Sequence, residues 1–144
     1  MSENQNKIKI ISDFITQIWD HGDLTGIETL IGHTYTIHCD PGDPWDGQEL
    51  SAEEFCNRVE KSRAPFPDQK FHIKKALASH ESVTMCWDWS AHHLGDIPNF
   101  PATGNEIKMR GMTVYFLEDS RLTGHWQSTD RLAVFQQLAA AKAT

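Results

Sequence analysis

Positive charge is scarce in this chain of 144 residues, and long apolar runs are absent. Thirteen Lys and Arg stand against 20 Asp and Glu, which gives a net charge of -7. Nonspecific binding to nucleic acid depends on neutralising phosphates with Lys and Arg, so we expect no nucleic-acid partner. No apolar run approaches the length of a membrane span, and an acidic chain has little attraction for anionic lipids. We therefore expect no membrane partner either.

Cysteine is also rare. Cys39, Cys56 and Cys86 are widely spaced and form no Cys-x-x-Cys motif. An odd number of cysteines without motif spacing favours reduced thiols in a reducing compartment. The polar start, residues 1–7, lacks the apolar segment of a secretory signal peptide. These features together predict a cytoplasmic protein.

Several catalytic and metal-binding motifs are missing as well. The chain has no His-x-x-x-His and no His-Glu-x-x-His, and the adjacent His92 and His93 would point to opposite faces of a strand. We therefore predict no metal site. No Gly-x-Ser-x-Gly occurs, and Cys86 is out of phase with the expected pocket side, so serine and cysteine triads have no support.

The first half of the chain has mainly helical patterns. Ile8, Ile11, Ile15 and Ile18 lie on one stripe of a helix predicted over 7–20, and Gly22 follows its end. A second, short helix is predicted over 24–31 and a short strand over 34–38. Residues 39–48 contain two Pro and two Gly and are predicted to form a loop. The Ser51-Ala-Glu-Glu54 capping box predicts a third helix that ends near Ser62, before Pro65.

The second half changes to the period of strands. Alternating apolar residues predict long antiparallel strands over 71–77, 83–93, 109–117 and 122–130, with a loop over 94–104 that contains Pro98 and Pro101. A final helix is predicted over 131–141. Hairpin-linked strands with helices gathered on one face indicate an α+β fold. The length fits one domain, residues 1–144.

Short motifs in a fixed order resemble one known family. They are Ile18-Trp19-Asp20-His21-Gly22-Asp23-Leu24, His38, Phe66-Pro67-Asp68, Ala91-His92-His93-Leu94-Gly95, Pro101-Ala102-Thr103-Gly104, His125-Trp126 with Asp130, and Gln137-Leu138. This pattern resembles the SnoaL-like polyketide cyclases, a branch of the nuclear-transport-factor-2-like fold. The resemblance implies a cone-shaped barrel, with a curved sheet around N-terminal helices and one deep apolar pocket. It also implies a homodimer formed through the sheets.

The resemblance implies a chemistry too. The family's cyclases close a polyketide ring by an intramolecular aldol reaction without cofactor or metal, and one Asp of the last strand acts as general acid and base. Gln127 stands at that position here, and an amide cannot take up a proton at neutral pH. Gly111 and Thr113 stand where the family's cyclases carry a polar partner on the adjacent strand.

Strand phase predicts which residues line this pocket, because residues two apart share a face. His125 and Gln127 share one side of the last strand, and by the resemblance that side faces the pocket. His93 falls on the pocket side of its own strand. We hypothesise that His93 and His125 form a catalytic pair, because histidine titrates near neutral pH, and that Gln127 orients the substrate as a neutral donor. The predicted ligand-binding residues are Trp19, His38, Met85, Trp87, Trp89, Met109, Thr113 and Tyr115.

Structural roles compete with these assignments. His125 could equally well pack on a neighbour, and structural roles are favoured for His93 and His38. Asp130 precedes the last helix, where an N-cap is favoured over an acid. Asp88 lies between two tryptophans and should face away from the pocket.

Three functions follow from these observations. The first is a cofactor-free enzyme, of cyclase, isomerase or hydrolase type, that transfers protons on a small apolar carbonyl-bearing substrate. The second is a non-catalytic small-molecule-binding domain of the same fold, which Gln127 favours. The third is a structural dimerisation module with a plugged pocket.

Overall fold

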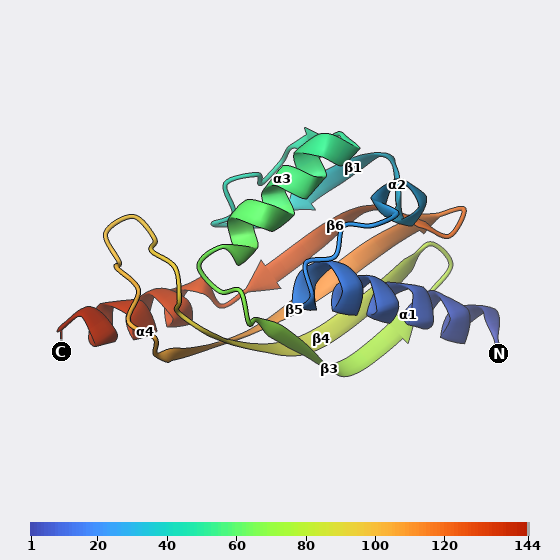
Figure 1. Ribbon diagram of the computed structural model, residues 1–144. Coiled ribbons are helices and arrows are strands. Elements are labelled where there is room, and N and C mark those ends of the chain that lie inside the picture. The colour runs from blue at the N-terminus through green and yellow to red at the C-terminus, as the bar shows by residue number, and fades with distance from the viewer. Residues whose placement is uncertain (144) are drawn as a thin grey trace.

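In the computed structural model, which describes residues 1–143, most helices lie in the first half of the chain and the long antiparallel strands follow them (Figure 1). The elements are α1 (Glu3–Phe14), the π-helix η1 (Ile15–Asp20), α2 (Ile27–Leu30), β1 (Ile31–Cys39), β2 (Glu49–Leu50), α3 (Ala52–Arg63), β3 (Lys70–Ala78), β4 (Ser82–His92), β5 (Glu106–Glu118), β6 (Arg121–Thr129) and α4 (Arg131–Ala143). The predicted α+β class is confirmed.

The N-terminal helix begins earlier than predicted and changes its winding. Ser2 accepts a hydrogen bond from the backbone of Gln5, and the Gln5 side chain bonds back to Ser2, so a capping box starts α1 at Glu3. From Ile15 the helix continues as η1, and Gly22 follows with a φ of +68°. Of the predicted apolar stripe, Ile11, Ile15 and Ile18 are buried, and Ile8 is partly buried against the core. The second predicted helix shortens to α2 because Ile31 already belongs to a strand.

Helix α3 begins where the capping box predicted. The Ser51 hydroxyl accepts a hydrogen bond from the Glu54 backbone, and the Glu54 carboxylate accepts one from the Ser51 backbone. Phe55, Arg58 and Val59 form its buried face. Spacings of three and four residues place these side chains on one side of the helix, toward the sheet.

The six strands form one curved, open sheet in the order β2-β1-β6-β5-β4-β3. Strands β3 to β6 are antiparallel neighbours, as predicted, whereas β1 runs parallel to β6. The short strand β2 was not predicted; it follows the predicted loop 39–48 directly and pairs with β1 through Leu50 and Tyr35. Helices α1 and α3 lie against the same side of the sheet, and α4 extends beyond the end of β6 (Figure 1).

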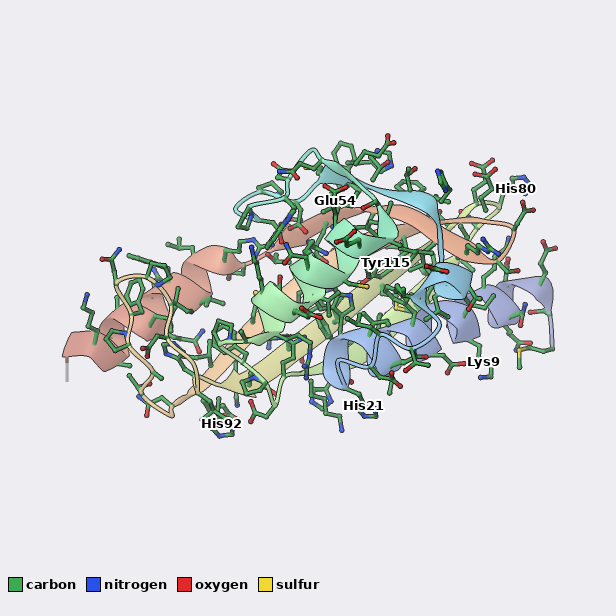
Figure 2. All side chains as sticks on the ribbon, turned by 45° about the horizontal axis from the view of Figure 1, so that its top comes forward. Lys9, His21, Glu54, His80, His92 and Tyr115 are labelled. Atoms are coloured by element: carbon green, nitrogen blue, oxygen red, sulfur yellow. The ribbon has the colours of Figure 1, made fainter. Side chains whose placement is uncertain are left out.

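Strand alternation separates an inner face from an outer one. On β4, Val83, Met85, Trp87, Trp89 and Ala91 are all buried, and the residues between them are not. Tyr115 of β5 lies inside, between the sheet and the helices, whereas His92 projects from the outside (Figure 2). Asp88 faces outward, as predicted, and pairs with Lys74 and Arg110. The Asp130 carboxylate accepts a hydrogen bond from the Ala133 backbone, which confirms the predicted N-cap of α4.

Among the described residues, no helix combines the length and the apolar character that a membrane crossing requires.

Candidate functional site

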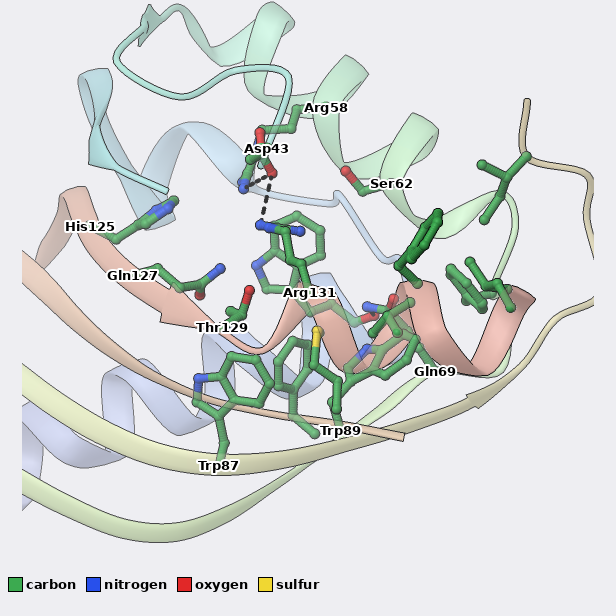
Figure 3. Close-up of a pocket in the computed structure, with 18 of the residues that line it drawn as sticks. Asp43, Arg58, Ser62, Gln69, Trp87, Trp89, His125, Gln127, Thr129 and Arg131 are labelled. Carbon is green, nitrogen blue, oxygen red and sulfur yellow. Dashed lines mark hydrogen bonds and ion pairs between the residues drawn. The ribbon is translucent and has the colours of Figure 1, made fainter. Parts of the chain in front are cut away.

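A cavity of about 370 Å³ opens between the inner face of the sheet, α3 and α4 (Figure 3). Its walls are largely aromatic and apolar, and polar side chains gather at one end. Seven of the predicted site residues line it: Trp19, Trp87, Trp89, Met109, Tyr115, His125 and Gln127. Such a combination of apolar walls and a few convergent polar groups is typical of small-molecule sites.

Two predicted residues lie beneath the pocket wall. Met85 and Thr113 are fully buried and do not line the cavity. The Thr113 hydroxyl nevertheless accepts a hydrogen bond from the Trp87 indole at 2.9 Å and donates one to the Gln127 amide oxygen at 2.7 Å. Thr113 therefore acts on the pocket through two of its wall residues.

His38 lies on the other side of the sheet. Its neighbour Ile37 is fully buried on the inner face, so alternation turns His38 outward, where it is exposed and meets Phe116 edge-on at 5.2 Å between ring centroids. His38 does not line the pocket.

The predicted pair of His93 and His125 is absent. His93 is fully buried, but neither of its ring nitrogens has a hydrogen-bond partner in the described structure. It lines a separate hollow of about 230 Å³ beside α4. The strand phase was right for His93, but β4 ends at His92 and the following loop carries His93 out of the main pocket.

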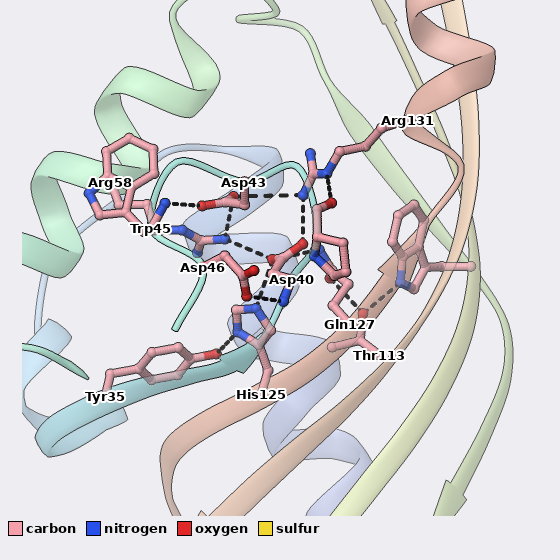
Figure 4. A network of polar contacts seen from close by, with 12 residues as sticks. Tyr35, Asp40, Asp43, Trp45, Asp46, Arg58, Thr113, His125, Gln127 and Arg131 are labelled. Atoms are coloured by element: carbon pink, nitrogen blue, oxygen red, sulfur yellow. Dashed lines mark hydrogen bonds and ion pairs between the residues drawn. The ribbon is translucent and has the colours of Figure 1, made fainter. Parts of the chain in front are cut away.

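The partner of His125 is Asp40, which the sequence analysis left in a loop without a role. The His125 Nε2 lies 2.9 Å from the Asp40 carboxylate, and its Nδ1 lies 2.7 Å from the Tyr35 hydroxyl (Figure 4). A carboxylate can only accept a hydrogen bond, so Nε2 carries the proton and Nδ1 accepts from Tyr35. Both ring nitrogens are thus engaged, and the tautomer of His125 is set by its neighbours.

Asp40 is the centre of this polar network. Its carboxylate, fully buried, receives hydrogen bonds from His125, from the Gln127 amide at 3.1 Å, from Arg58 at 3.3 Å and from Arg131 at 2.6 Å. Asp43 pairs with Arg58 at 3.0 Å and lies 3.7 Å from Arg131. Two carboxylates therefore face two guanidinium groups, and the charges of the cluster balance.

Burial and hydrogen bonding shift the pKa values of these groups in opposite ways. Burial disfavours the charged form of Asp40, but the hydrogen bonds from His125 and Arg131 outweigh it and lower its pKa. Burial lowers the pKa of His125, and the bond to Asp40 only partly offsets this. Burial also raises the pKa of Tyr35 well above its ordinary value. The ground state at neutral pH is thus an ionised Asp40, a neutral His125 and a protonated Tyr35.

Gly111 shapes the floor of the pocket. A Cβ at this position would lie 2.4 Å from Cζ2 of Trp87, so the indole occupies the space that a side chain would need. Trp87 in turn meets Phe71 edge-on at 4.9 Å. The absence of a side chain on β5 is therefore what lets β4 supply an aromatic floor.

The pocket also contains unused hydrogen-bonding capacity. Arg58 and Thr129 line the cavity, and Arg58 Nε and Thr129 Oγ1 are buried without a hydrogen-bond partner in residues 1–143. Buried polar atoms are normally paired, and leaving one unpaired costs about 1–3 kcal/mol. Among the described residues, no group of three or more His, Cys, Asp or Glu is arranged to hold a metal ion.

Similarity to known proteins identifies the family of this chain. The SnoaL-like polyketide cyclase family matches residues 9–138. The chain belongs to this family. A solved structure from Acidithiobacillus ferrooxidans, described as a candidate polyketide cyclase, shares 46% identity over 98% of this chain and 99% of its own, with a TM-score of 0.92. No curated protein matched the chain.

More distant structures share the fold of this SnoaL-like chain. IdmH, a candidate polyketide cyclase from Streptomyces antibioticus, is 20% identical over 96% of this chain and 99% of its own, with a TM-score of 0.75. AclR, a candidate hydroxylase from Streptomyces galilaeus, is 17% identical over 95% and 87%, with a TM-score of 0.79. At these identities the likeness concerns the fold alone.

Four residues of this network were not predicted from the sequence: Tyr35, Asp40, Arg58 and Arg131. A usable signal existed for Tyr35, since it lies two residues before Ile37 and therefore shares the inner face of β1 with it. Arg58 had a weaker one, because it lies on the buried face of α3 with Phe55. Asp40 had none, because an Asp before Pro41-Gly42 is also typical of an ordinary turn.

Proposed function

We propose that this SnoaL-like protein is a cofactor-free enzyme of the polyketide cyclase type that transfers protons on a small, apolar, carbonyl-bearing substrate. The observation that carries the proposal is the buried Tyr35–His125–Asp40 chain at the polar end of an aromatic pocket. General acid–base catalysis commonly uses a side chain that transfers the proton, here Tyr35, next to a base, here His125, whose ring is oriented by a further group, here Asp40.

The proton path follows from the tautomer of His125. A substrate α-proton passes to the Tyr35 oxygen while the Tyr35 proton passes to Nδ1 of His125. The C–H electron pair becomes an enolate, which attacks a second carbonyl carbon of the same molecule and forms the new C–C bond. The resulting alkoxide takes the proton back through Tyr35, and His125 returns to its neutral form.

Asp40 is the group that makes the intermediate state accessible. When His125 becomes an imidazolium, the ionised Asp40 lies 2.9 Å from its Nε2 and stabilises the charge. In this proposal Asp40 replaces the carboxylate that Gln127 does not supply, from the loop after β1 instead of from β6. It acts through His125 and is therefore a positioning residue.

Donors at the same end of the pocket would stabilise the enolate oxygen. Gln127 uses one amide hydrogen on Asp40, which leaves the second for the substrate. Arg58 Nε and Thr129 Oγ1, the two unpaired atoms, add further capacity. A substrate oxygen would then satisfy groups that the free protein leaves unpaired.

A second function, non-catalytic binding of a small molecule, also has a specific observation in its favour. Both ring nitrogens of His125 are already engaged, and Gln127 cannot act as a base. A pocket with this geometry could hold a ligand without changing it.

Proton exchange at the α-carbon distinguishes the two functions. The protein would be incubated in D₂O with 2-tetralone, an aromatic ketone, and deuterium uptake followed by NMR. The proposed enzyme should accelerate uptake, and Tyr35→Phe and Asp40→Asn should each slow it at least 100-fold. Binding of 2-tetralone with the exchange rate of buffer alone would favour the second function. His33→Gln, at an exposed site on β1, is the matched control and should exchange like the wild type.

We also propose that the protein is a cytoplasmic homodimer formed through the outer face of its sheet. Cys39, Cys56 and Cys86 are free thiols, which suits a reducing compartment. On the outer face, Trp126 lies opposite Val114, and both Trp126 and Met112 are 54% exposed. Large exposed apolar side chains grouped on a sheet favour association with another protein surface.

A further inference from the structure

His93 is the buried polar side chain that neither the fold nor the proposed reaction uses. Its side chain is fully buried, and both of its ring nitrogens lack a partner in residues 1–143. A neutral imidazole has one donor and one acceptor nitrogen, and buried groups of this kind are normally paired. A partner is therefore missing at this place in the fold.

The surroundings of His93 are a hollow of about 230 Å³ between the loop 93–104 and α4. Phe100, Pro101, Ala102 and Leu138 give it an apolar character, and Thr103 and Lys142 add polar atoms. Lys142 is held by the backbone carbonyl of Asn99 at 2.6 Å and lies 5.2 Å from the centre of the Phe100 ring. The positive charge of Lys142 and the apolar walls disfavour a cationic or metal ligand there. They favour a ligand group that is neutral, such as a hydroxyl or a carbonyl.

Only side chains separate this hollow from the main pocket. Phe100 and Leu138 line both cavities, and Phe66 lines the main pocket while its ring lies 5.6 Å from that of His93. We call Phe66, Phe100 and Leu138 the apolar partition. Phe100 belongs to the loop between β4 and β5 and is only half-buried, so its movement would join the two cavities without disturbing the sheet.

We propose that His93 is a distal binding subsite for the same ligand. The ligand class is an elongated aromatic molecule with an oxygen at each end, one at the polar network around Asp40 and the other, a neutral hydroxyl or carbonyl, at His93. The inference rests on the proposed function only in that the main pocket must accept an aromatic ligand. It assigns His93 to binding and not to proton transfer.

The test uses two rod-shaped probes that differ by one hydroxyl, 4-hydroxybiphenyl and 4,4′-dihydroxybiphenyl. Calorimetry should show that the wild type binds the diol about fivefold to tenfold more tightly than the mono-ol, the gain typical of one hydrogen bond. His93→Phe should bind the two probes equally, and His93→Gln, which keeps a hydrogen-bonding side chain, should retain part of the preference. His92→Gln changes the neighbouring outward histidine and should leave the preference unchanged.

A second measurement follows binding in the wild-type protein alone and does not require any variant to bind the probes. In protein with ¹⁵N-labelled histidine, the ring resonances of His93, identified by their loss in His93→Gln, should move with the diol and not with the mono-ol. Equal affinities in the wild type, a diol preference that survives in His93→Phe, or no binding of either probe would each overturn the proposal. Neither probe is a ketone, so these outcomes are independent of the exchange assay with 2-tetralone.

Discussion

At the scale of single residues, Asp40 decides the character of the pocket. Its carboxylate binds His125 and Gln127 of β6 and the arginines Arg58 of α3 and Arg131 of α4, which are three different elements. Through His125 it is also linked to Tyr35 of β1. A buried charge is tolerated only when it is paired with an opposite charge or with hydrogen-bond donors. The carboxylate of Asp40 is stabilised by these partners, and the buried guanidinium of Arg58 is stabilised by the carboxylate in turn.

Removal of this charge should be costly. Asp40→Asn leaves Arg58 and Arg131 with only Asp43 to balance them, so we expect a loss of about 3 kcal/mol or more in the free energy of unfolding. Urea denaturation followed by fluorescence measures it. Asp13→Asn, which breaks an exposed pair with Lys9, should change stability by less than about 1 kcal/mol. A loss of that small size for Asp40→Asn would show that the network is not essential to the fold.

His125 predicts how stability depends on pH. Its pKa is lower in the folded protein than its ordinary value of 6.5, so the unfolded chain binds more protons near that pH. The stability from neutral His125 is therefore complete above about pH 6.5 and is lost as the pH falls toward the folded pKa. Asp40 acts in the same direction below its ordinary value of 3.8.

The measurement is the free energy of unfolding from pH 7.5 to pH 5. It should fall on acidification in the wild type, and the slope should be smaller in His125→Gln. His33→Gln, at an exposed position, should keep the slope of the wild type. An unchanged slope in His125→Gln would contradict the interpretation.

At the scale of secondary-structure elements, the pairing of β4 with β5 builds the pocket floor. Gly111 lies directly opposite Trp87 in the register of the two strands. The close approach of the indole to the β5 backbone is possible only because β5 has no side chain there.

Gly111→Ala should therefore displace the Trp87 ring. The expected cost is about 1–3 kcal/mol, as for other overpacked sites, together with weaker ligand binding. Thermal and urea denaturation measure the first effect. The double variant Gly111→Ala/Trp87→Phe provides the control, because the smaller ring should relieve the contact and recover part of the loss. If the single variant is as stable as the wild type, the ring is not confined as described.

At the scale of the whole molecule, the sheet has two faces with different uses. The inner face covers the core and the pocket, and the outer face exposes an apolar group made of Met112, Val114, Phe116 and Trp126. Alternation along β5 and β6 places all four on one side. A second copy of the chain would cover them.

Trp126→Glu should thus convert the proposed homodimer into a monomer. A charge at the centre of an apolar contact is expensive to bury, and the folded monomer itself should be unaffected because Trp126 is exposed. Light scattering coupled to gel filtration measures the mass. Leu94→Glu, equally exposed but in the loop after β4, should leave the mass unchanged. A monomeric wild type would refute the dimer.

The sequence by itself determined the features that depend on neighbours along the chain. The phase of β4, β5 and β6, the capping box of α3 and the N-cap at Asp130 each arise within a few residues. Each motif that indicates the family is likewise a short run of neighbours, and the order of the motifs can be read along the chain. The same phase placed Trp87, Met109 and Gln127 at the pocket.

Tertiary structure alone decided which polar groups meet there. The contact of Asp40 with His125 spans 85 residues, and no local pattern distinguishes this Asp from one in a turn. Likewise, alternation predicts the face of the sheet on which His93 lies but not the residue at which β4 ends. His93 was therefore predicted to lie in the main pocket with His125, whereas it lines the hollow beside α4. Short-range periodicity specifies the direction of a side chain, whereas its partner depends on how strands distant in sequence are brought together by the core.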